Sequence, residues 1–550
     1  MESGQIWTSA TERPSAGVAY GRNGMVASAS PTAAAVGLSV LQRGGNAFDA
    51  ALAVAGVEWF SLPGSCGLGG DFFAVLHDAK RREVRAFNGS GEAARAASRE
   101  FYVNQGLTNM PLSGWHSAGV PGAPDAYCTL HREYATMPLR DLWGPALRYA
   151  TDGIITTDRI HGAIAAGAEK LGRFPTTAAI YLPNGAPPPV GTPWRNLDLA
   201  RTIEAVIDGG SNAYYRGPIA AEIVRAAQAD GGLFGLDEFA DQQTEIYSPL
   251  RSSYRGVDVH VTRPPSQGLV ILEMLNLLSG YDLKSLGFGS AETLHTMVEA
   301  KKLAFADRLR YCGDPRRVDQ RPVEHLLSAV YADRRRRDID PEHAATRVEG
   351  AQLEALSGHT SYFCVADGDG NAISLIHSLS AGFGSGVVAG KTGVILNNRV
   401  GRGFTLEEGH PNVIDGGKKT MHTLNCYLGT RDGQFAFMGG TPGGDQQPQW
   451  NVQMITNLID FGMSPQEAID APRWYSFPST DPEHVKKPFL VRIEDRFDEG
   501  AIEGLRRRGH DVQTMGPWGV GGAVQLIVRN ENGVLAGGSD PRARGVAIGY

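Results

Sequence analysis

The stretch SGHTSYFCVADGDGNAISLIHSLS, residues 357–380, decides how the rest of the sequence is interpreted. Two β-rich runs, 362–365 and 372–379, flank a cluster of turn formers at 367–371 that tolerate positive φ. The pattern predicts a β-hairpin, with Thr360 just before its first strand. Thr360 is either an ordinary β-branched residue entering a strand or a residue with a chemical role, and the hairpin alone does not distinguish the two.

Bulk composition describes a globular protein. The chain has 550 residues, of which 42% are hydrophobic and 20% charged. Length alone suggests about three or four domains, although layered folds can run long without dividing. The net charge of -7 gives no electrostatic reason to expect nucleic acid or an anionic membrane as partner.

The cysteines and the N-terminal residues indicate the compartment. The five cysteines are scattered and form no C-x-x-C pair, which is typical of reduced core residues rather than of a disulfide framework or a zinc site. The start, MESGQIWTSATERPSAG, has no basic residues followed by an apolar run, and no segment approaches 18 uninterrupted apolar residues. We therefore expect a cytoplasmic protein with no membrane span.

Periodicity along the chain predicts one layered α+β body. Apolar residues at helical spacing predict a helix over 291–311, and one further helix is expected near 449–471. From Ser361 onward the chain otherwise shifts to strands and tight turns. Helices first, strands later and no low-complexity linker favour a single body over separate domains.

Two glycine-rich stretches resemble nucleotide-binding loops without matching them. GLGGDF (67–72) has Phe72 where a dinucleotide loop has its third glycine. SGVVAGKT (385–392) has Ser385 where a phosphate loop begins with glycine. A nucleotide-dependent enzyme is therefore a disfavoured alternative.

Thr360 has a chemical role if the chain is cut just before it. Its own α-amine, with a pKa of about 7.7–8.0, would then serve as the base that activates its hydroxyl. Gly443 and Gly444, in TPGGDQQPQW (441–450), offer unobstructed backbone N–H groups for an oxyanion hole, although a plain turn explains this pair as well.

Eight segments, taken together, resemble the γ-glutamyltranspeptidase family of N-terminal-nucleophile hydrolases from about Gly24 to Tyr550. They are GMVASASPTAAAVGLSVLQRGGNAFDAALA (24–53), GLGGDFF (67–73), VPG (120–122), RPPSQG (263–268), EAKKLAFADRLRYCGDP (299–315), HTSYFCVADGDGNAIS (359–374), FGSGVVAGKTGVILNN (383–398) and TPGG (441–444). The resemblance implies a four-layer αββα sandwich with no metal or organic cofactor.

The resemblance also assigns catalytic roles. Thr360 matches the nucleophile, so autocleavage between His359 and Thr360 would give a large chain 1–359 and a small chain 360–550 that together form one structural domain. Ser378 falls where the family has a second threonine that contacts the amine of the nucleophile. Gly443 and Gly444 match the oxyanion pair.

The substrate-binding positions depart from the family pattern. After the Asn397–Asn398 pair, Arg399 and Arg402 stand where the family usually has glutamine and the acid that holds a substrate ammonium. A like-charge pair at 4 Å costs ~4 kcal/mol at an effective dielectric of about 20. The expected substrate-binding residues are Asn398, Arg399, Arg402, Ser380, His422 and Thr423. The alternative for the two arginines is a surface loop that pairs with Glu407 or Glu408.

These departures predict a self-processing amidohydrolase for a small acidic amide, such as an oxamate-like compound or a dicarboxylate monoamide, without a free α-ammonium. The alternatives are a γ-glutamyltransferase or glutathione hydrolase with another donor-binding mode, a cephalosporin-type acylase, and an uncut, non-enzymatic scaffold. The expected assembly is a heterodimer of the two cleavage products, with a dimer of these units left open.

Overall fold

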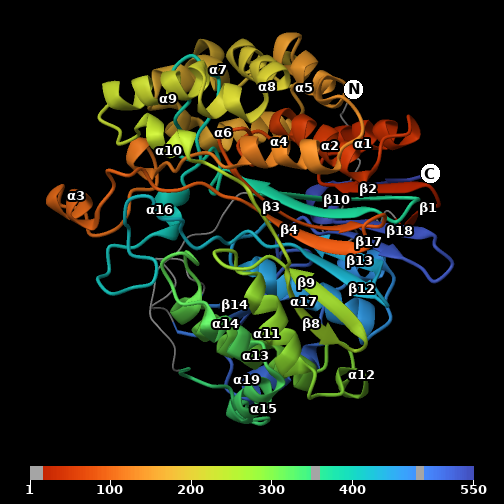
Figure 1. The fold of residues 1–550 in the computed structure, drawn as a ribbon. Helices are drawn as coiled ribbons and strands as arrows, with labels where there is room; N and C mark the ends of the chain where they lie inside the picture. Colours follow the sequence, from red (N-terminus) through yellow and green to blue (C-terminus); the bar gives the residue numbers. More distant parts are fainter. Residues whose placement is uncertain (1–16, 349–359, 479–487) are drawn as a thin grey trace, which may run out of the picture.

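The computed structural model describes residues 17–348, 360–478 and 488–550. Two seven-stranded antiparallel sheets lie face to face at the centre (Figure 1). The first contains, in spatial order, β1 (Ala19–Gly21), β18 (Leu535–Ser539), β17 (Gln525–Arg529), β13 (Gln434–Gly440), β12 (Tyr427–Arg431), β9 (Val257–Val261) and β8 (Leu250–Tyr254). The second contains β19 (Val546–Gly549), β2 (Gly24–Ser28), β10 (Ser361–Asp367), β11 (Ala372–Ser378), β3 (Asp71–Asp78), β4 (Glu83–Gly89) and β7 (Glu245–Tyr247).

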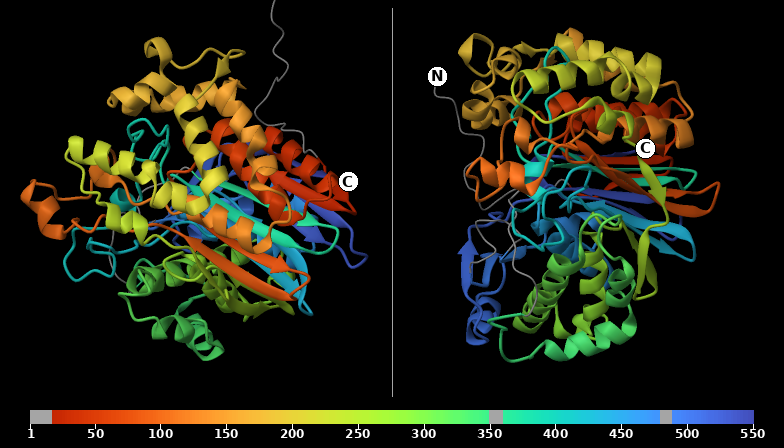
Figure 2. Two further views of the ribbon diagram at one scale, coloured as in Figure 1. Left: turned by 45° about the horizontal axis from the view of Figure 1, so that its top comes forward. Right: turned by 60° about the vertical axis from the view of Figure 1, so that its left-hand side comes forward.

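A layer of helices covers the outer face of each sheet, one at the top and one at the bottom of Figure 1 and again on opposite sides in Figure 2. The layer beside β10 contains α1 (Pro31–Gln42), α2 (Ala47–Ser61), α4 (Ala123–Tyr134), α5 (Leu139–Thr151), α6 (Asp158–Gly172), α7 (Pro175–Tyr181), α8 (Leu197–Tyr215) and α9 (Pro218–Ala229). The layer beside β12 contains α11 (Gly268–Leu278), α13 (Ala291–Tyr311), α17 (Gln446–Ile459), α18 (Pro465–Asp470) and α19 (Glu499–Arg507).

Shorter elements lie around these four layers. They are β5 (Ile154–Ile155), β6 (Pro193–Trp194), β14 (Trp474–Phe477), β15 (Leu490–Glu494), β16 (Val512–Met515), α3 (Arg99–Asn104), α10 (Leu236–Ala240), α12 (Leu283–Leu286), α14 (Arg321–Leu326), α15 (Ala329–Arg335) and α16 (Arg399–Gly403).

The buried side chains form one large cluster at each of the three layer interfaces. Because side chains alternate along a strand, β10 contributes to two of them. Phe363 and Val365 pack against α1 and α2, whereas Tyr362 and Cys364 pack between the sheets. The third cluster lies between the β12 sheet and α11, α13 and α17. The predicted four-layer αββα sandwich is confirmed.

The β10–β11 hairpin is inserted between strands from the first part of the chain. β10 pairs with β2, and β11 pairs with β3. At the turn, the Asp367 carboxylate accepts hydrogen bonds from the N–H groups of Asp369 and Asn371, and Gly370 has a φ of +92°. Residues before and after position 359 therefore contribute strands to one continuous sheet.

Most local predictions are confirmed, but the expectation of only one helix after Ser361 is wrong, because α16 and α19 are also present there. The hairpin is present, α13 spans the predicted 291–311, and all five cysteines are buried and free. The single helix expected near 449–471 is two helices, because Gly462 has a φ of +66° and Ser464 starts α18 with a capping box completed by Glu467.

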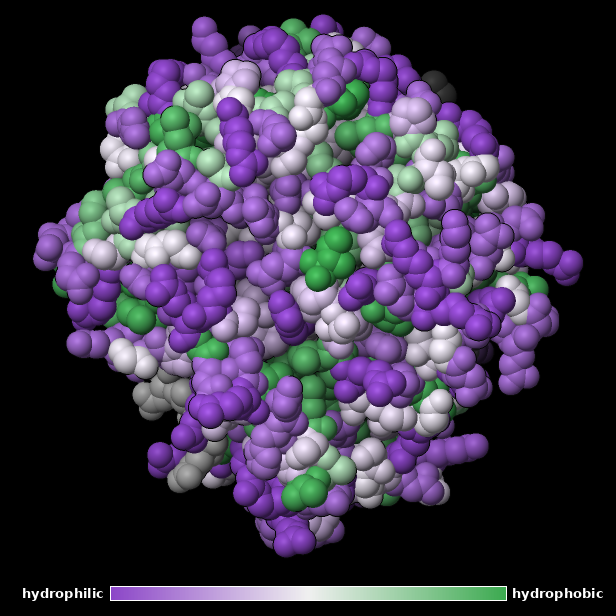
Figure 3. Space-filling view, in the orientation of Figure 1, coloured by the Kyte–Doolittle hydropathy of each residue, from purple (hydrophilic) through white to green (hydrophobic). Residues whose placement is uncertain are grey.

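The face of the molecule drawn in Figure 3 is mostly polar. On the face seen in Figure 3, hydrophilic residues predominate and hydrophobic ones gather only in small groups. Within the described ranges, no helix is both long and apolar enough to cross a membrane.

Candidate active site

The hydroxyl groups of Thr360 and Ser378 meet at the open end of the β10–β11 hairpin. The two strands pair Ser361 with His377, so one further step in the same antiparallel register sets Thr360 opposite Ser378. Their oxygens lie 3.1 Å apart, and both residues are buried. His359, the other residue predicted at the cleavage point, lies outside the described residues.

Backbone groups hold Ser378 closely. The N–H of Ser380 donates to Ser378 Oγ at 2.8 Å, and Ser380 has a φ of +83°, a conformation that is rare for a residue with a side chain. On the other side, Gly70 permits close approach, because a Cβ there would lie 2.4 Å from the Ser378 carbonyl oxygen. Gly70 of GLGGDFF thus allows two backbone segments to pack closely beside Ser378.

Arg399 and Arg402 are buried, and both contact residues around Ser378. Arg399 Nε donates to Asp71 Oδ2 at 3.0 Å, and Asp71 pairs with Ser378 across the β3–β11 ladder. Arg402 Nη1 donates to the carbonyl oxygen of Ser380 at 2.9 Å. The surface-loop alternative is therefore wrong: Glu407 and Glu408 are exposed, whereas Arg399 finds its carboxylate on a neighbouring strand.

The Arg399–Asp71 pair is almost completely removed from water. Burial raises the pKa of Asp71 from its ordinary value, and the charge of Arg399 opposes that rise. Burial also lowers the pKa of Arg399, which Asp71 opposes in turn. The second terminal nitrogen of Arg399, Nη2, has no hydrogen-bond acceptor among the described residues.

His422 lies beside this pair as a neutral imidazole. Burial, together with the charges of Arg399 and Lys419, lowers its pKa well below the ordinary value. The ring packs against Phe73 at 5.0 Å between centroids, and its Nδ1 lies 4.0 Å from Asp71 Oδ2. Neither ring nitrogen has a hydrogen-bond partner within the described part of the chain. A buried polar group of this kind is typical of a ligand site.

Gly443 and Gly444 form the turn that leads into α17. Their φ values of +136° and +59° favour glycine, and a Cβ on Gly443 would lie 2.5 Å from the Trp450 ring. The preceding strand, β13, ends at Gly440, where a Cβ would meet the ring of Tyr362, two residues from Thr360. The Gly443–Gly444 turn therefore comes just after the end of β13, and that end packs beside the start of β10.

The amide of Gln267 holds this turn against the segment that carries Thr423. Its Nε2 donates to the carbonyl oxygens of Thr423, at 2.5 Å, and Gly444, at 3.1 Å. Arg308 contacts the Gln267 Oε1 atom and forms an ion pair with Asp445 at 2.7 Å. A buried polar network thus fixes both backbone segments.

The side-chain amide of Asn398 is held by backbone groups. It accepts a hydrogen bond from the Ala381 N–H and donates one to the Leu112 carbonyl oxygen, both at 2.9 Å. Asn398 therefore fixes the loop beside Ser380.

A cavity of about 570 Å³ opens beside this loop. Its lining comes from loops 63–65, 112–113 and 381–383, from α6, and from Asn398 and Arg402. Lys170 of α6 also lines it and donates to the carbonyl oxygens of Gly382, at 2.9 Å, and Gly384, at 3.2 Å. The cavity therefore carries three cationic side chains, those of Lys170, Arg173 and Arg402, and the carboxylate of Glu169, which pairs with Arg173.

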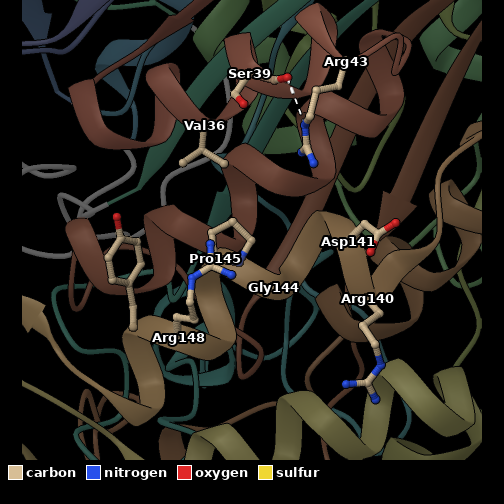
Figure 4. A pocket seen from close by; sticks show the side chains of 9 residues that line it. Val36, Ser39, Arg43, Arg140, Asp141, Gly144, Pro145 and Arg148 are labelled. Carbon is tan, nitrogen blue, oxygen red and sulfur yellow. Dashed lines mark hydrogen bonds between the residues drawn. The ribbon is translucent and has the colours of Figure 1, made fainter.

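A second cavity, of about 480 Å³, lies between α1 and α5 in the outer helical layer (Figure 4). In Figure 4, Arg43 contacts Ser39 of its own helix, through the carbonyl oxygen at 3.2 Å. None of the candidate site residues lines this cavity, so it is separate from the site around Thr360.

Two buried groups bring three possible metal ligands together. They are Glu58, Cys66 and His377, and His295, Glu299 and His510. Within them, His377 contacts Glu58 through Nε2 and the Tyr127 hydroxyl through Nδ1, His295 contacts His510, and Glu299 pairs with Lys302 at 2.7 Å. Apart from the Cys66 thiol, these groups therefore already have protein partners.

Three important contacts at the site were missed by sequence reasoning: those of Asp71, Gln267 and Glu58. Asp71 and Gln267 lie inside quoted segments, but their partners are distant in sequence. Of the three, only Glu58 carried a signal, as the carboxylate that interrupts the apolar run from Ala50 onward in α2.

The comparisons with known proteins cover nearly the whole chain. The family model described as Gamma-glutamyltranspeptidase matches residues 33–550. The glutathione hydrolase-like YwrD proenzyme of Bacillus subtilis is 36% identical over 96% of this chain and 99% of its own length. The oxamate amidohydrolase proenzyme of Klebsiella pneumoniae is 31% identical over 96% and 98%.

Among solved structures, the cephalosporin acylase from Bacillus halodurans superposes with a TM-score of 0.91, at 35% identity, over 100% of this chain and 99% of that one. The extent of the family match and the similarity of the fold support the same family assignment. The chain belongs to the gamma-glutamyltranspeptidase family and is an enzyme of the N-terminal-nucleophile hydrolase class.

Proposed function

We propose that this protein is a self-processing amidohydrolase whose nucleophile is Thr360. Cleavage of the bond between His359 and Thr360 would give chains 1–359 and 360–550, which remain together because each contributes strands to both sheets. The proenzyme names of the relatives support such processing. The freed α-amine of Thr360 then acts as base for its own hydroxyl.

The proposed reaction has two steps. Thr360 Oγ1 attacks the amide carbon of the substrate while the α-amine takes the hydroxyl proton and passes it to the leaving amine. An ester to Thr360 forms as the C–N bond breaks. Water, deprotonated by the same amine, hydrolyses that ester and regenerates the hydroxyl. The N–H groups of Gly443 and Gly444 would stabilise the oxyanion of each step.

The proposed substrate is a small amide with an anionic group and no free α-ammonium. The observation that carries this proposal is the buried Arg399, whose Nη2 has no acceptor among the described residues although its Nε is used by Asp71. A carboxylate accepts well from such a guanidinium, whereas an ammonium would be repelled. His422 offers a neutral hydrogen-bonding partner beside it. The oxamate amidohydrolase relative is consistent with this class.

A cephalosporin-type acylase is the second candidate. The cavity of about 570 Å³ beside Arg402 favours this function, because its volume is larger than a molecule of oxamate requires. The similarity to a cephalosporin acylase structure also favours it. In that case Lys170 and Arg402 would face the distal carboxylate of a longer acyl group.

Three substrates offered to the processed protein separate these activities. Ammonia release from oxamate or a dicarboxylate monoamide, with little nitroaniline from γ-glutamyl-p-nitroanilide, is the expected result. Rapid nitroaniline release would overturn the substrate proposal in favour of a γ-glutamyl hydrolase or transferase. Turnover of a glutaryl amide of a large amine, with no ammonia released from oxamate, would favour the acylase. A Thr360→Ala variant that still splits into two chains would overturn the role of the nucleophile.

A further inference from the structure

A buried carboxylate, that of Glu58, lies behind the two hydroxyl groups of the proposed site. Glu58 is in the last turns of α2, which begins at a capping box formed by Asn46 and Asp49 and packs across β10 and β11. Its side chain has no exposed surface. An acidic residue in such a place requires specific partners, because an uncompensated buried charge is costly.

The carboxylate of Glu58 contacts the neighbour of each reacting residue. Ser361 Oγ donates to Oε2 at 2.6 Å, and His377 Nε2 lies 2.8 Å from the same oxygen. Ser361 follows Thr360, and His377 precedes Ser378. Successive side chains of a strand point to opposite faces, so Glu58 binds the helix-facing side of the hairpin end while the two hydroxyl groups lie on its inner side.

The hydrogen bonds of Glu58 and His377 continue on both sides of this contact. Ser28 Oγ donates to Oε1 at 2.6 Å and itself accepts from the Ser30 N–H. On the far side of His377, Nδ1 lies 2.6 Å from the hydroxyl of Tyr127, which accepts from Trp59 Nε1. Every group in this series has a partner if each one donates to the next: Trp59 to Tyr127, Tyr127 to His377 Nδ1, and His377 Nε2 to Glu58.

The nearby Cys66 takes no part as a nucleophile. Burial and the negative charge of Glu58 both raise the pKa of the Cys66 thiol. It is therefore a small neutral packing residue in this region, and the hydrogen-bonding function belongs to the carboxylate.

We propose that Glu58 is a positioning residue that sets the separation of Thr360 and Ser378 by binding Ser361 and His377 through one carboxylate oxygen. This inference rests on the proposed role of Thr360. It explains why α2 carries a buried acid at the end of its apolar run, far from the capping box. Because Glu58 binds the residues of the last β10–β11 ladder pair, Ser361 and His377, it restrains the two strands from sliding or splaying beyond that pair.

The test uses autocleavage, which needs no added substrate. Freshly synthesised Ser361→Ala precursor should convert to two chains between about 10- and 100-fold more slowly than the wild type, since misplacement of a reacting group by about 1 Å can cost that much. Ser361→Thr, which keeps the hydroxyl, should recover most of the rate. Because both act through the same bond, Glu58→Gln combined with Ser361→Ala should be no slower than the slower single variant.

Ser374→Ala is the matched control. It removes a buried hydroxyl from the same hairpin, one that lies 2.8 Å from the Tyr362 hydroxyl on the other face, and should lose comparable stability without slowing cleavage. A Ser361→Ala precursor that cleaves within twofold of Ser374→Ala would overturn the role of Glu58.

Thr360→Ala separates this inference from the function on which it rests. If Thr360→Ala stays uncut and Ser361→Ala cleaves as fast as Ser374→Ala, only the role of Glu58 fails. If Thr360→Ala is cleaved, both proposals fail.

Discussion

The hydroxyl oxygens of Thr360 and Ser378 lie 3.1 Å apart across the open end of the β10–β11 hairpin. The hairpin register itself generates this contact, because Thr360 and Ser378 continue the pairing of Ser361 with His377. The Ser380 N–H donates to the Ser378 oxygen, so the Ser378 hydroxyl proton remains able to point at Thr360.

Replacement of Ser378 by alanine should slow catalysis without weakening substrate binding. The loss of one hydrogen bond to the reacting group is worth ~1.5–3 kcal/mol where a charged group is involved, which is about a 10- to 100-fold fall in kcat. KM should change little. Steady-state kinetics on the processed variant check this, and Ser378→Thr, which keeps a hydroxyl, should retain most of the activity. An equal rise in KM with kcat unchanged would contradict the prediction.

The hairpin and α13 were predictable because their signals are local. A turn cluster at 367–371 and helical periodicity over 291–311 need no knowledge of the rest of the chain. The split between α17 and α18 was also encoded locally, in Gly462 and the Ser464 cap, but was missed. Thr360, Ser378 and the glycine pair were found through family resemblance rather than through periodicity.

The partners of the site residues were not predictable from the sequence. Asp71 and Arg399 are 328 residues apart in the chain. The segment before α16 brings them together, because the N–H groups of Asn397 and Asn398 donate to the carbonyl oxygens of Gly69 and Leu379. The sequence showed that Arg399 is a cation but not that a carboxylate of the same site already binds it. Whether Arg399 is already paired depends on its burial beside Asp71, and that burial depends on the packing of all four layers.

Removal of Arg399 should destabilise the fold through Asp71. Arg399→Ala leaves the Asp71 carboxylate buried without its cation, which typically costs ~3–5 kcal/mol. Urea unfolding of Arg399→Ala, made in the uncleavable Thr360→Ala chain, measures this loss in free energy of unfolding. Adding Asp71→Asn should recover part of the loss, because the buried charge is then absent.

The same variant should show a defined pH dependence. Burial already raises the pKa of Asp71 in the wild type, and without Arg399 it should rise further. A raised carboxyl pKa means that the folded state binds the proton more tightly than the unfolded state, so stability falls as pH rises. The loss in free energy of unfolding that Arg399→Ala causes should therefore be larger at pH 8 than at pH 5. A deficit that is equal at both pH values would contradict a buried, uncompensated Asp71.

A methyl group on Gly443 should disable the proposed oxyanion hole. Alanine there is strained at a φ of +136°, and its Cβ would lie 2.5 Å from the Trp450 ring, so the turn must shift. Loss of one oxyanion donor costs ~2.7–4 kcal/mol, about 10²- to 10³-fold in kcat. Gly462→Ala, at a φ of +66° with open space around it, is the control for backbone strain alone. Equal kcat losses in the two variants would argue against an oxyanion role.

Acid sensitivity of the fold should come in part from His510. Burial, with the charges of Lys302, His295 and Arg508, lowers the pKa of His510 to about 3. Its Nε2 lies 2.8 Å from His295 Nδ1, against α13. Between pH 6.5 and about 3 the unfolded chain binds a proton at this residue that the folded chain does not, so stability must fall as pH falls through that window.

The size of this contribution can be measured by urea unfolding of the Thr360→Ala chain at pH 7, 6, 5 and 4. A depressed pKa of this extent is worth at most roughly 3–5 kcal/mol over the whole window. His510→Asn should flatten the decline, and His343→Asn, at a side chain that is 80% exposed, should not. His260 and His410, whose pKa values burial lowers to about 4, should keep part of the slope in both variants. An unchanged slope in His510→Asn would show that the folded chain protonates His510 as readily as the unfolded chain does.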